Sequence, residues 1–194
     1  MMFPLSITKD EVMERPLSHY NGKIRIVSDP KETDRIVGEL LNESVVGFDT
    51  EAKPTFKKGQ RRRISLIQVA TEKAVYLFRI KRTGLSDVML SFLESEEVTK
   101  VGIGLTDDFQ LLKEIRTFSP GGFVDLNDTF TELGAEKIGA RNLSAMVLDI
   151  RISKSAQTSN WEAETLSEKQ QKYAATDAWI CLEMYKKLDY WGYL

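Results

Sequence analysis

The stretch that decides the fold is residues 45–51, Val45-Val46-Gly47-Phe48-Asp49-Thr50-Glu51. Its β-branched and aromatic residues predict a short strand that runs directly into two acids. Because strand side chains alternate between the two faces of a sheet, Asp49 and Glu51 lie on the same face. Two carboxylates on the core side of a central strand would be costly to desolvate without a cation. The stretch therefore predicts a central strand that carries a metal site.

Two later segments add acids to apolar stretches. Asp108 follows the strand expected at residues 99–103, and Tyr173 lies four residues before Asp177 in a stretch with helical periodicity. A step of four places the phenol and the carboxylate on one face of a helix. The three segments together supply four carboxylates and one phenol, namely Asp49, Glu51, Asp108, Asp177 and Tyr173.

Carboxylates that converge without Lys or Arg among them repel one another and resist desolvation. Hard divalent cations with oxygen ligands relieve both penalties, so the acids predict a site for two Mg²⁺ or Mn²⁺ ions. No His or Cys partner accompanies them, which argues against a dedicated zinc site. The chemistry that such a site favours is two-metal hydrolysis of a phosphodiester.

Composition limits the class of protein. With 194 residues and 42% apolar side chains, the chain has the length and the core-forming content of one α/β domain. Lys and Arg number 27 against 29 Asp and Glu, a net charge of -2, so any nucleic-acid contact has to come from a local patch. The single cysteine, the lack of a signal-peptide pattern and the lack of a stretch as long as a membrane span predict a soluble cytoplasmic protein without membrane contact.

The order of the expected elements indicates the fold. Residues 1–22 read as an N-terminal arm and residues 23–194 as one domain. Residues 23–27 alternate as a strand, and further strands are expected at 45–51, 64–70, 74–80, 99–103 and 123–125, the first three of these five antiparallel. Helices are expected after Pro30, at 86–93, from Thr106, on both sides of Gly139, and from a Ser167–Gln170 capping box to about Asp189. From residue 45 onward, this order predicts an α/β fold of the ribonuclease H-like kind, a mixed five-stranded sheet flanked by helices.

Three motifs resemble those of a known family. They are Val46-Gly47-Phe48-Asp49-Thr50-Glu51, Val101-Gly102-Ile103-Gly104-Leu105-Thr106-Asp107-Asp108 and Tyr173-Ala174-Ala175-Thr176-Asp177-Ala178. Together they resemble the DEDD 3′-5′ exonucleases, in the Tyr branch that includes the Werner-syndrome exonuclease domain and ribonuclease D. The resemblance implies a metal-dependent exonuclease that removes nucleoside monophosphates from the 3′ end of DNA or RNA.

The resemblance also implies roles for the residues. Asp49, Glu51 and Asp177 would hold one ion that activates water, Asp49 and Asp108 would hold a second ion that stabilises the leaving oxygen, and Tyr173 would orient the attacking water. Asp107 and Asp108 compete for one position, because either could cap the helix. The spacing from the Gly-x-Gly at 102–104 matches the family's acid at Asp108. One departure is Glu164-Thr165, where many relatives carry an Arg-Pro pair.

Five cations follow the first motif, namely Lys57, Lys58, Arg61, Arg62 and Arg63. Their place at the rim of the predicted site favours contacts with the phosphates of a nucleic-acid strand, and a solvated charged turn is the alternative. His19, the only histidine, is expected on the surface of the arm without site chemistry. Trp161 is expected to pack against the final helix rather than stack on a base.

The function predicted from these residues is that of a single-domain 3′-5′ exonuclease acting on a nucleic acid with a 3′ end. Two alternatives stay open: a non-catalytic nucleic-acid-binding domain of the same fold, and an endonuclease or other phosphodiesterase. The four acids and Tyr173 argue against the binding domain, because carboxylates repel phosphate. Nothing in the sequence selects DNA over RNA, since the 2′-hydroxyl is read by groove residues that the sequence does not locate.

Overall fold

The structure is a computed structural model that describes residues 2–54 and 62–194. Its described residues form one mixed sheet in the order β1-β4-β3-β2-β5-β6. The strands β2, β3 and β4 are antiparallel to one another, as predicted, while β1, β5 and β6 each join in parallel. The strands are β1 (Ile24–Val27), β2 (Val45–Ala52), β3 (Ile64–Ala70), β4 (Val75–Arg79), β5 (Thr99–Gly102) and β6 (Phe123–Asp125).

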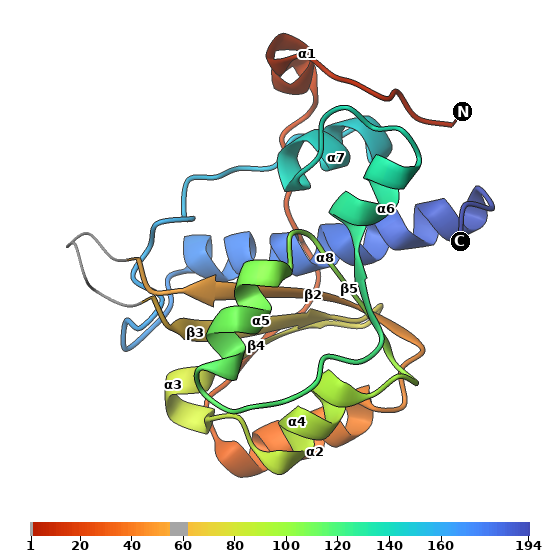
Figure 1. Ribbon diagram of the computed structural model, residues 1–194. Coiled ribbons are helices and arrows are strands. Elements are labelled where there is room, and N and C mark those ends of the chain that lie inside the picture. The colour runs from red at the N-terminus through yellow and green to blue at the C-terminus, as the bar shows by residue number, and fades with distance from the viewer. Residues whose placement is uncertain (1, 55–61) are drawn as a thin grey trace.

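Helices cover both faces of this sheet. Figure 1 shows α8 lying along one face, with α6, α7 and α1 beyond it, and α2 and α4 against the opposite face. The described helices are α1 (Lys9–Glu14), α2 (Pro30–Leu40), α3 (Ile80–Thr83), α4 (Asp87–Glu94), α5 (Thr106–Lys113), α6 (Leu126–Glu132), α7 (Ala140–Val147) and α8 (Glu168–Tyr190). None of them is both long and apolar enough to span a bilayer.

The helix boundaries follow the local signals of the sequence. Asp29 caps α2 with Pro30 at its first position, and Gly139 separates α6 from α7. At α8 the Ser167 hydroxyl accepts from the backbone N–H of Gln170, and the Gln170 side chain accepts from the backbone N–H of Ser167. This reciprocal pair is the predicted capping box, which fixes where the 23-residue helix α8 begins.

The α/β fold is confirmed, but the sheet has six described strands rather than five. The additional strand is β1, which pairs in parallel with β4 from Ile24 opposite Val75 to Val27 opposite Phe78. Local alternation predicts that residues 23–27 form a strand. It does not say which edge of the sheet they join, because parallel pairing depends on contacts distant in sequence.

One glycine decides how closely α8 approaches β2. A Cβ built on Gly47 would lie 2.0 Å from the backbone oxygen of Ala178, so only glycine allows this contact. Gly47, Asp49 and Glu51 share a strand face by the two-residue period. The close packing of Gly47 against Ala178 therefore brings the two strand acids beside Asp177, the neighbour of Ala178.

The arm lies against the α8 side of the domain. Phe3, Ile7 and Val12 are buried in the same cluster as residues of α6, α7 and α8. Farther along, Leu17 forms a parallel bridge with Arg151, and the backbone N–H of Tyr20 donates to Thr176 Oγ1 at 2.9 Å. These contacts fix residues 16–20 between the loop after α7 and the first half of α8.

Candidate metal centre

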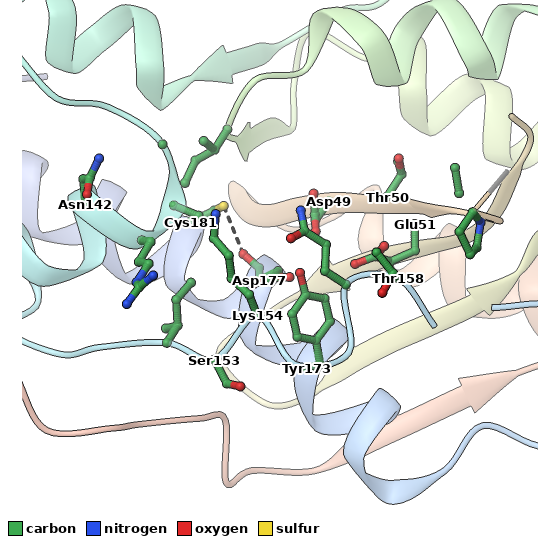
Figure 2. A pocket seen from close by; sticks show the side chains of 18 of the residues that line it. Asp49, Thr50, Glu51, Asn142, Ser153, Lys154, Thr158, Tyr173, Asp177 and Cys181 are labelled. Atoms are coloured by element: carbon green, nitrogen blue, oxygen red, sulfur yellow. Dashed lines mark hydrogen bonds between the residues drawn. The ribbon is translucent and has the colours of Figure 1, made fainter. Parts of the chain in front are cut away.

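Three acids converge where β2 and α8 meet. Asp49 and Glu51 come from β2 and Asp177 from α8, and each offers a carboxylate oxygen within 4.8 Å of the others. Figure 2 shows the side chains of Asp49, Glu51, Asp177 and Tyr173 directed toward one another. Glu51 is buried, and the two aspartates are half-buried. The face shared by Asp49 and Glu51, inferred from strand alternation, is thus the face that meets α8.

The electrostatics of this cluster are those of crowded anions. Burial, followed by repulsion from Asp177, raises the pKa of Asp49 well above its usual value and raises the pKa of Glu51 to about 9. Burial likewise raises the pKa of Asp177 to about 7. Among the ion pairs formed between described residues, none includes these acids. Buried oxygen ligands without a countercharge fit a hard divalent cation.

Asp108 lies beside this cluster and is held by a hydrogen bond. The Thr50 hydroxyl, on the opposite face of β2 from Asp49, donates to Asp108 Oδ1 at 2.6 Å. Asp108 is half-buried on α5, and burial raises its pKa to about 6. Its charge contributes to the raised pKa of both Asp49 and Glu51. Asp107 is exposed, so of the two candidates Asp108 is the one with a contact to the acid-bearing strand.

A residue that the sequence-based reading missed fixes the start of α5. The carboxylate of Asp125, at the end of β6, accepts from the backbone N–H of Gly104 at 2.9 Å and of Leu105 at 2.8 Å. Gly104 has φ +71°, a conformation that favours glycine. Asp125 thereby holds the turn that directs α5, and with it Asp108, toward β2. The available signal was an acid at a strand end, beside a strand that runs into Gly-x-Gly.

Tyr173 lies beside the acids. It is one turn of α8 before Asp177, and its side chain is directed toward the Asp177 carboxylate. Burial and the nearby carboxylates raise the pKa of the phenol, which therefore keeps its proton at neutral pH. Behind it the ring of Trp161 lies 5.9 Å away, centre to centre. Trp161 is fully buried, so its indole packs in the core as predicted.

The acids open into a groove of about 790 Å³ that extends to the start of α7. Arg62 lines this groove, and Arg63 is exposed. The other members of the predicted basic run, Lys57, Lys58 and Arg61, lie outside the described residues. Further polar residues of this groove that the sequence did not assign to the site include Arg141, Asn142 and Lys154.

The segment at Glu164, where many relatives carry an Arg-Pro pair, is held by two arginines. Arg79 Nη1 donates to the backbone oxygen of Glu164 at 2.7 Å, Arg82 Nη2 donates to the same oxygen at 2.9 Å, and Arg79 also contacts the Ala163 oxygen. The segment after Trp161 is therefore held through its main chain by arginines from β4 and α3. This docking is independent of the side chain at position 164.

Comparison with known proteins agrees with this architecture. A family model described as "3'-5' exonuclease" matches residues 24–190. The bifunctional 3′-5′ exonuclease/ATP-dependent helicase WRN of Mus musculus is 36% identical over 160 residues, which cover 79% of this chain and 11% of that protein. The chain thus spans only a small part of that relative.

Solved structures share the fold. The Nibbler EXO domain of Aedes aegypti superposes with a TM-score of 0.78 at 22% identity, covering 89% of this chain and 93% of that one. RNase D of Trypanosoma brucei, in a complex with RNA U12, gives a TM-score of 0.74 at 21% identity, covering 92% and 64%. Because the family model covers all three acid-bearing segments, the chain belongs to the 3′-5′ exonuclease family.

Proposed function

We propose that this chain is a metal-dependent 3′-5′ exonuclease that removes nucleoside monophosphates from the 3′ end of DNA or RNA. The observation that carries the proposal is the convergence of Asp49, Glu51 and Asp177 within 4.8 Å, without an ion pair among the described residues. A fold retains such repulsion where a bound cation relieves it.

Asp49, Glu51 and Asp177 would hold one Mg²⁺ or Mn²⁺, and Asp49 with Asp108 would hold a second. Bound there, the ions would favour the ionisation of water and stabilise negative charge on the phosphate oxygens. Thr50 positions Asp108 through its 2.6 Å hydrogen bond. That bond occupies one carboxylate oxygen and leaves the other free to act as a ligand.

Tyr173 orients water in this proposal and does not act as the base. Its raised pKa keeps the hydroxyl protonated, so the phenol is a poor proton acceptor at neutral pH. The hydroxyl lies beside the acids, and its ring is backed by Trp161. A fixed hydroxyl beside the acids is placed to align a water molecule with the scissile phosphate.

Cations on the groove provide for a polyanionic substrate. Arg62 and Lys154 line the same groove as the acids, and both act on them electrostatically: Arg62 lowers the pKa of Glu51 and Lys154 that of Asp177. Lys57, Lys58, Arg61 and Arg63 would extend this positive rim along the strand. The RNA in the T. brucei RNase D complex makes RNA a substrate to test beside DNA.

The proposal is tested with 5′-labelled DNA and RNA oligonucleotides of one sequence, incubated with Mg²⁺ or with EDTA. We expect a ladder of products shortened stepwise from the 3′ end, formed only with Mg²⁺, together with release of nucleoside monophosphates. A single internal cut would point to an endonuclease. Tight binding of the oligonucleotides without cleavage in Mg²⁺ would support the non-catalytic alternative.

A further inference from the structure

A second cavity, of about 340 Å³, lies between the arm and α8. The arm contributes Leu17, Ser18 and His19, and α8 contributes residues from Glu168 to Thr176. Tyr173 and Ser153 line both this cavity and the acid-bearing groove, so the two spaces adjoin at the Tyr173 ring. Its volume is at the lower end of the range of about 300–1,000 Å³ for ligand sites. We call it the arm cavity.

Hydrogen bonds on either side fix the arm wall of this cavity. The backbone N–H of Ser18 donates to the Arg151 oxygen at 2.9 Å, and the Arg151 N–H donates to the Pro16 oxygen at 2.9 Å. Tyr20 is tied to Thr176 by a further bond of 2.9 Å. The wall is thus preformed, which lowers the entropic cost of binding a ligand there.

The lining combines an exposed apolar and aromatic surface with positive charge. Leu17 is 57% exposed and His19 is also exposed, so both side chains are accessible to a ligand in the cavity. Lys169 and Lys172 line the α8 side, and Lys172 Nζ pairs with Glu168 Oε1 at 2.8 Å. Among the ion pairs between described residues Lys169 takes part in none, so its ammonium group is available to an anionic ligand.

We propose that the arm cavity binds one nucleotide of the substrate strand, on the 5′ side of the bond that is cleaved. The base would contact Leu17, His19 and the Tyr173 ring, and a backbone phosphate would contact Lys169. That this nucleotide lies on the 5′ side of the cleaved bond follows from the proposed function, on which this inference rests. A 3′-5′ exonuclease has a single nucleotide on the 3′ side of the cleaved bond, and the groove of about 790 Å³ beside the acids accommodates it.

The arm wall of this subsite comes from residues that precede the match to the family model. The family model begins at residue 24, so Leu17, Ser18 and His19 lie outside the part of the chain that it matches. Contacts made by the arm therefore add to whatever the family domain contributes. They make the affinity for a strand depend on nucleotides beyond the one released.

The test compares two substrates that differ in whether they reach the arm cavity. One is an octanucleotide, and the other is the p-nitrophenyl ester of thymidine 5′-monophosphate, which has no nucleotide on the 5′ side of the cleaved bond. In the double variant His19→Ala/Lys169→Ala we expect kcat/KM for the octanucleotide, divided by kcat/KM for the ester, to fall about tenfold. The dependence of log KM on log salt should flatten by about 0.7 for the lost phosphate contact.

Lys31→Ala is the matched control, because Lys31 is an exposed lysine on α2, across the sheet from the arm. Its substrate ratio should equal that of the wild type. A ratio within twofold of wild type in the double variant, or an equal loss on both substrates, would overturn the subsite. If the wild type cleaves neither substrate, the proposed function fails by itself. The subsite is then tested by fluorescence anisotropy with the octanucleotide and Mg²⁺, where the double variant should bind about tenfold more weakly, and equal binding contradicts it.

Discussion

The neighbouring strands β2 and β5 each bury ionisable groups, but they differ in whether the protein supplies partners for the buried charge. On β2, Asp49 and Glu51 meet Asp177 without a cationic partner among described ion pairs, and their pKa values are raised. On β5, Lys100 is fully buried, and its Nζ donates to the backbone oxygens of Ser95 at 2.8 Å and Val98 at 2.7 Å. The ammonium also lies 5.0 Å from the ring centre of Phe123.

The comparison separates a structural charge from a functional one. Lys100 finds its acceptors within the protein, where it holds the chain that follows α4. The acids of β2 take part in no ion pair between described residues, which supports our proposal that a bound cation balances their charge. A single buried charge therefore does not by itself indicate a functional site. Several buried carboxylates that lie together without hydrogen-bonded or ion-paired partners do indicate a site for a cation.

The largest effect is expected from removing one acid. Asp49→Asn should lower exonuclease activity by at least about 10³, because it disrupts the cation that stabilises charge in the transition state. Lys100→Met should leave the Mg²⁺ dependence of the reaction in place. The measurement is single-turnover cleavage of a 5′-labelled oligonucleotide, with circular dichroism to establish folding. Near wild-type cleavage by folded Asp49→Asn would contradict the site.

Tyr173→Phe should reduce turnover by about 10- to 10³-fold, the range of positioning and proton-transfer effects. The phenol is not a ligand in this account, so the affinity for Mn²⁺ should change little. Turnover and calorimetric Mn²⁺ binding are measured on the same preparation. Loss of Mn²⁺ binding together with turnover would move Tyr173 into the ligand set.

Asp108→Asn should stabilise the metal-free protein at pH 8. The folded pKa of Asp108, about 6, lies above its usual 3.8, so the folded state holds this proton more tightly than the unfolded chain. Stability from this group is full below about pH 4 and is lost as pH rises through 6. At pH 8 the substitution should recover about 1–3 kcal/mol, and at pH 4 almost nothing.

The same melts test the link to the cation. Mg²⁺ should raise the melting temperature of the wild type in a concentration-dependent way, and that of Asp108→Asn by less, because only the assembled cluster binds the ion. Wild type and Asp108→Asn are melted in EDTA and in Mg²⁺, each at pH 4 and at pH 8, which gives four conditions in which the two proteins are compared. A lower metal-free melting temperature for Asp108→Asn at pH 8, with no effect of Mg²⁺ on either protein, would show that these carboxylates share no cation.

Lys100 should give a pH dependence of the opposite sign. Burial lowers its pKa to about 8 from 10.5, so between these values the unfolded chain binds more protons than the folded one. Stability contributed by this group therefore rises with pH over that interval, by up to about 3 kcal/mol. The test is urea unfolding at pH 8 and pH 10 in wild type and Lys100→Met. The difference between the two proteins should change in this direction; a constant difference would mean that Lys100 does not titrate there.

The smallest effect is expected at the rim of the groove. Arg62→Ala should raise KM a few-fold and flatten the dependence of log KM on log salt by about 0.7, the value for one phosphate contact on a single strand. Lys31→Ala is the control, because Lys31 is an exposed cation on α2, on the opposite face of the sheet. An identical salt dependence in wild type and Arg62→Ala would make the rim arginine a solvated charge.

The placing of the acids on β2 and α8 could be predicted from the sequence because it depends on local periodicity. The alternation along β2 places Asp49 and Glu51 on one face, and the four-residue step places Tyr173 and Asp177 together on α8. The Ser167–Gln170 capping box likewise predicted where α8 begins. These are relations between residues a few positions apart.

The features that the sequence did not reveal depend on long-range contacts. Three such features bring together segments far apart in the chain. They are the edge position of β1, the hydrogen bonds of Asp125 to the turn before α5, and the arm wall beside Tyr173. Lys100 shows the same limit, since a lysine within a strand reads as a solvent-facing residue until both faces of the sheet are known to be covered. His19 reads as a plain surface residue for the same reason.

The most direct test of the central claim is a calorimetric titration of Mn²⁺ into the wild type and into folded Asp49→Asn at pH 7. The claim is that Asp49, Glu51 and Asp177 form a shared cation site. It predicts a saturable heat of binding in the wild type that is lost, or weakened at least tenfold, in the variant, because one carboxylate ligand is replaced by a neutral amide. Equal binding isotherms for the two proteins would contradict it.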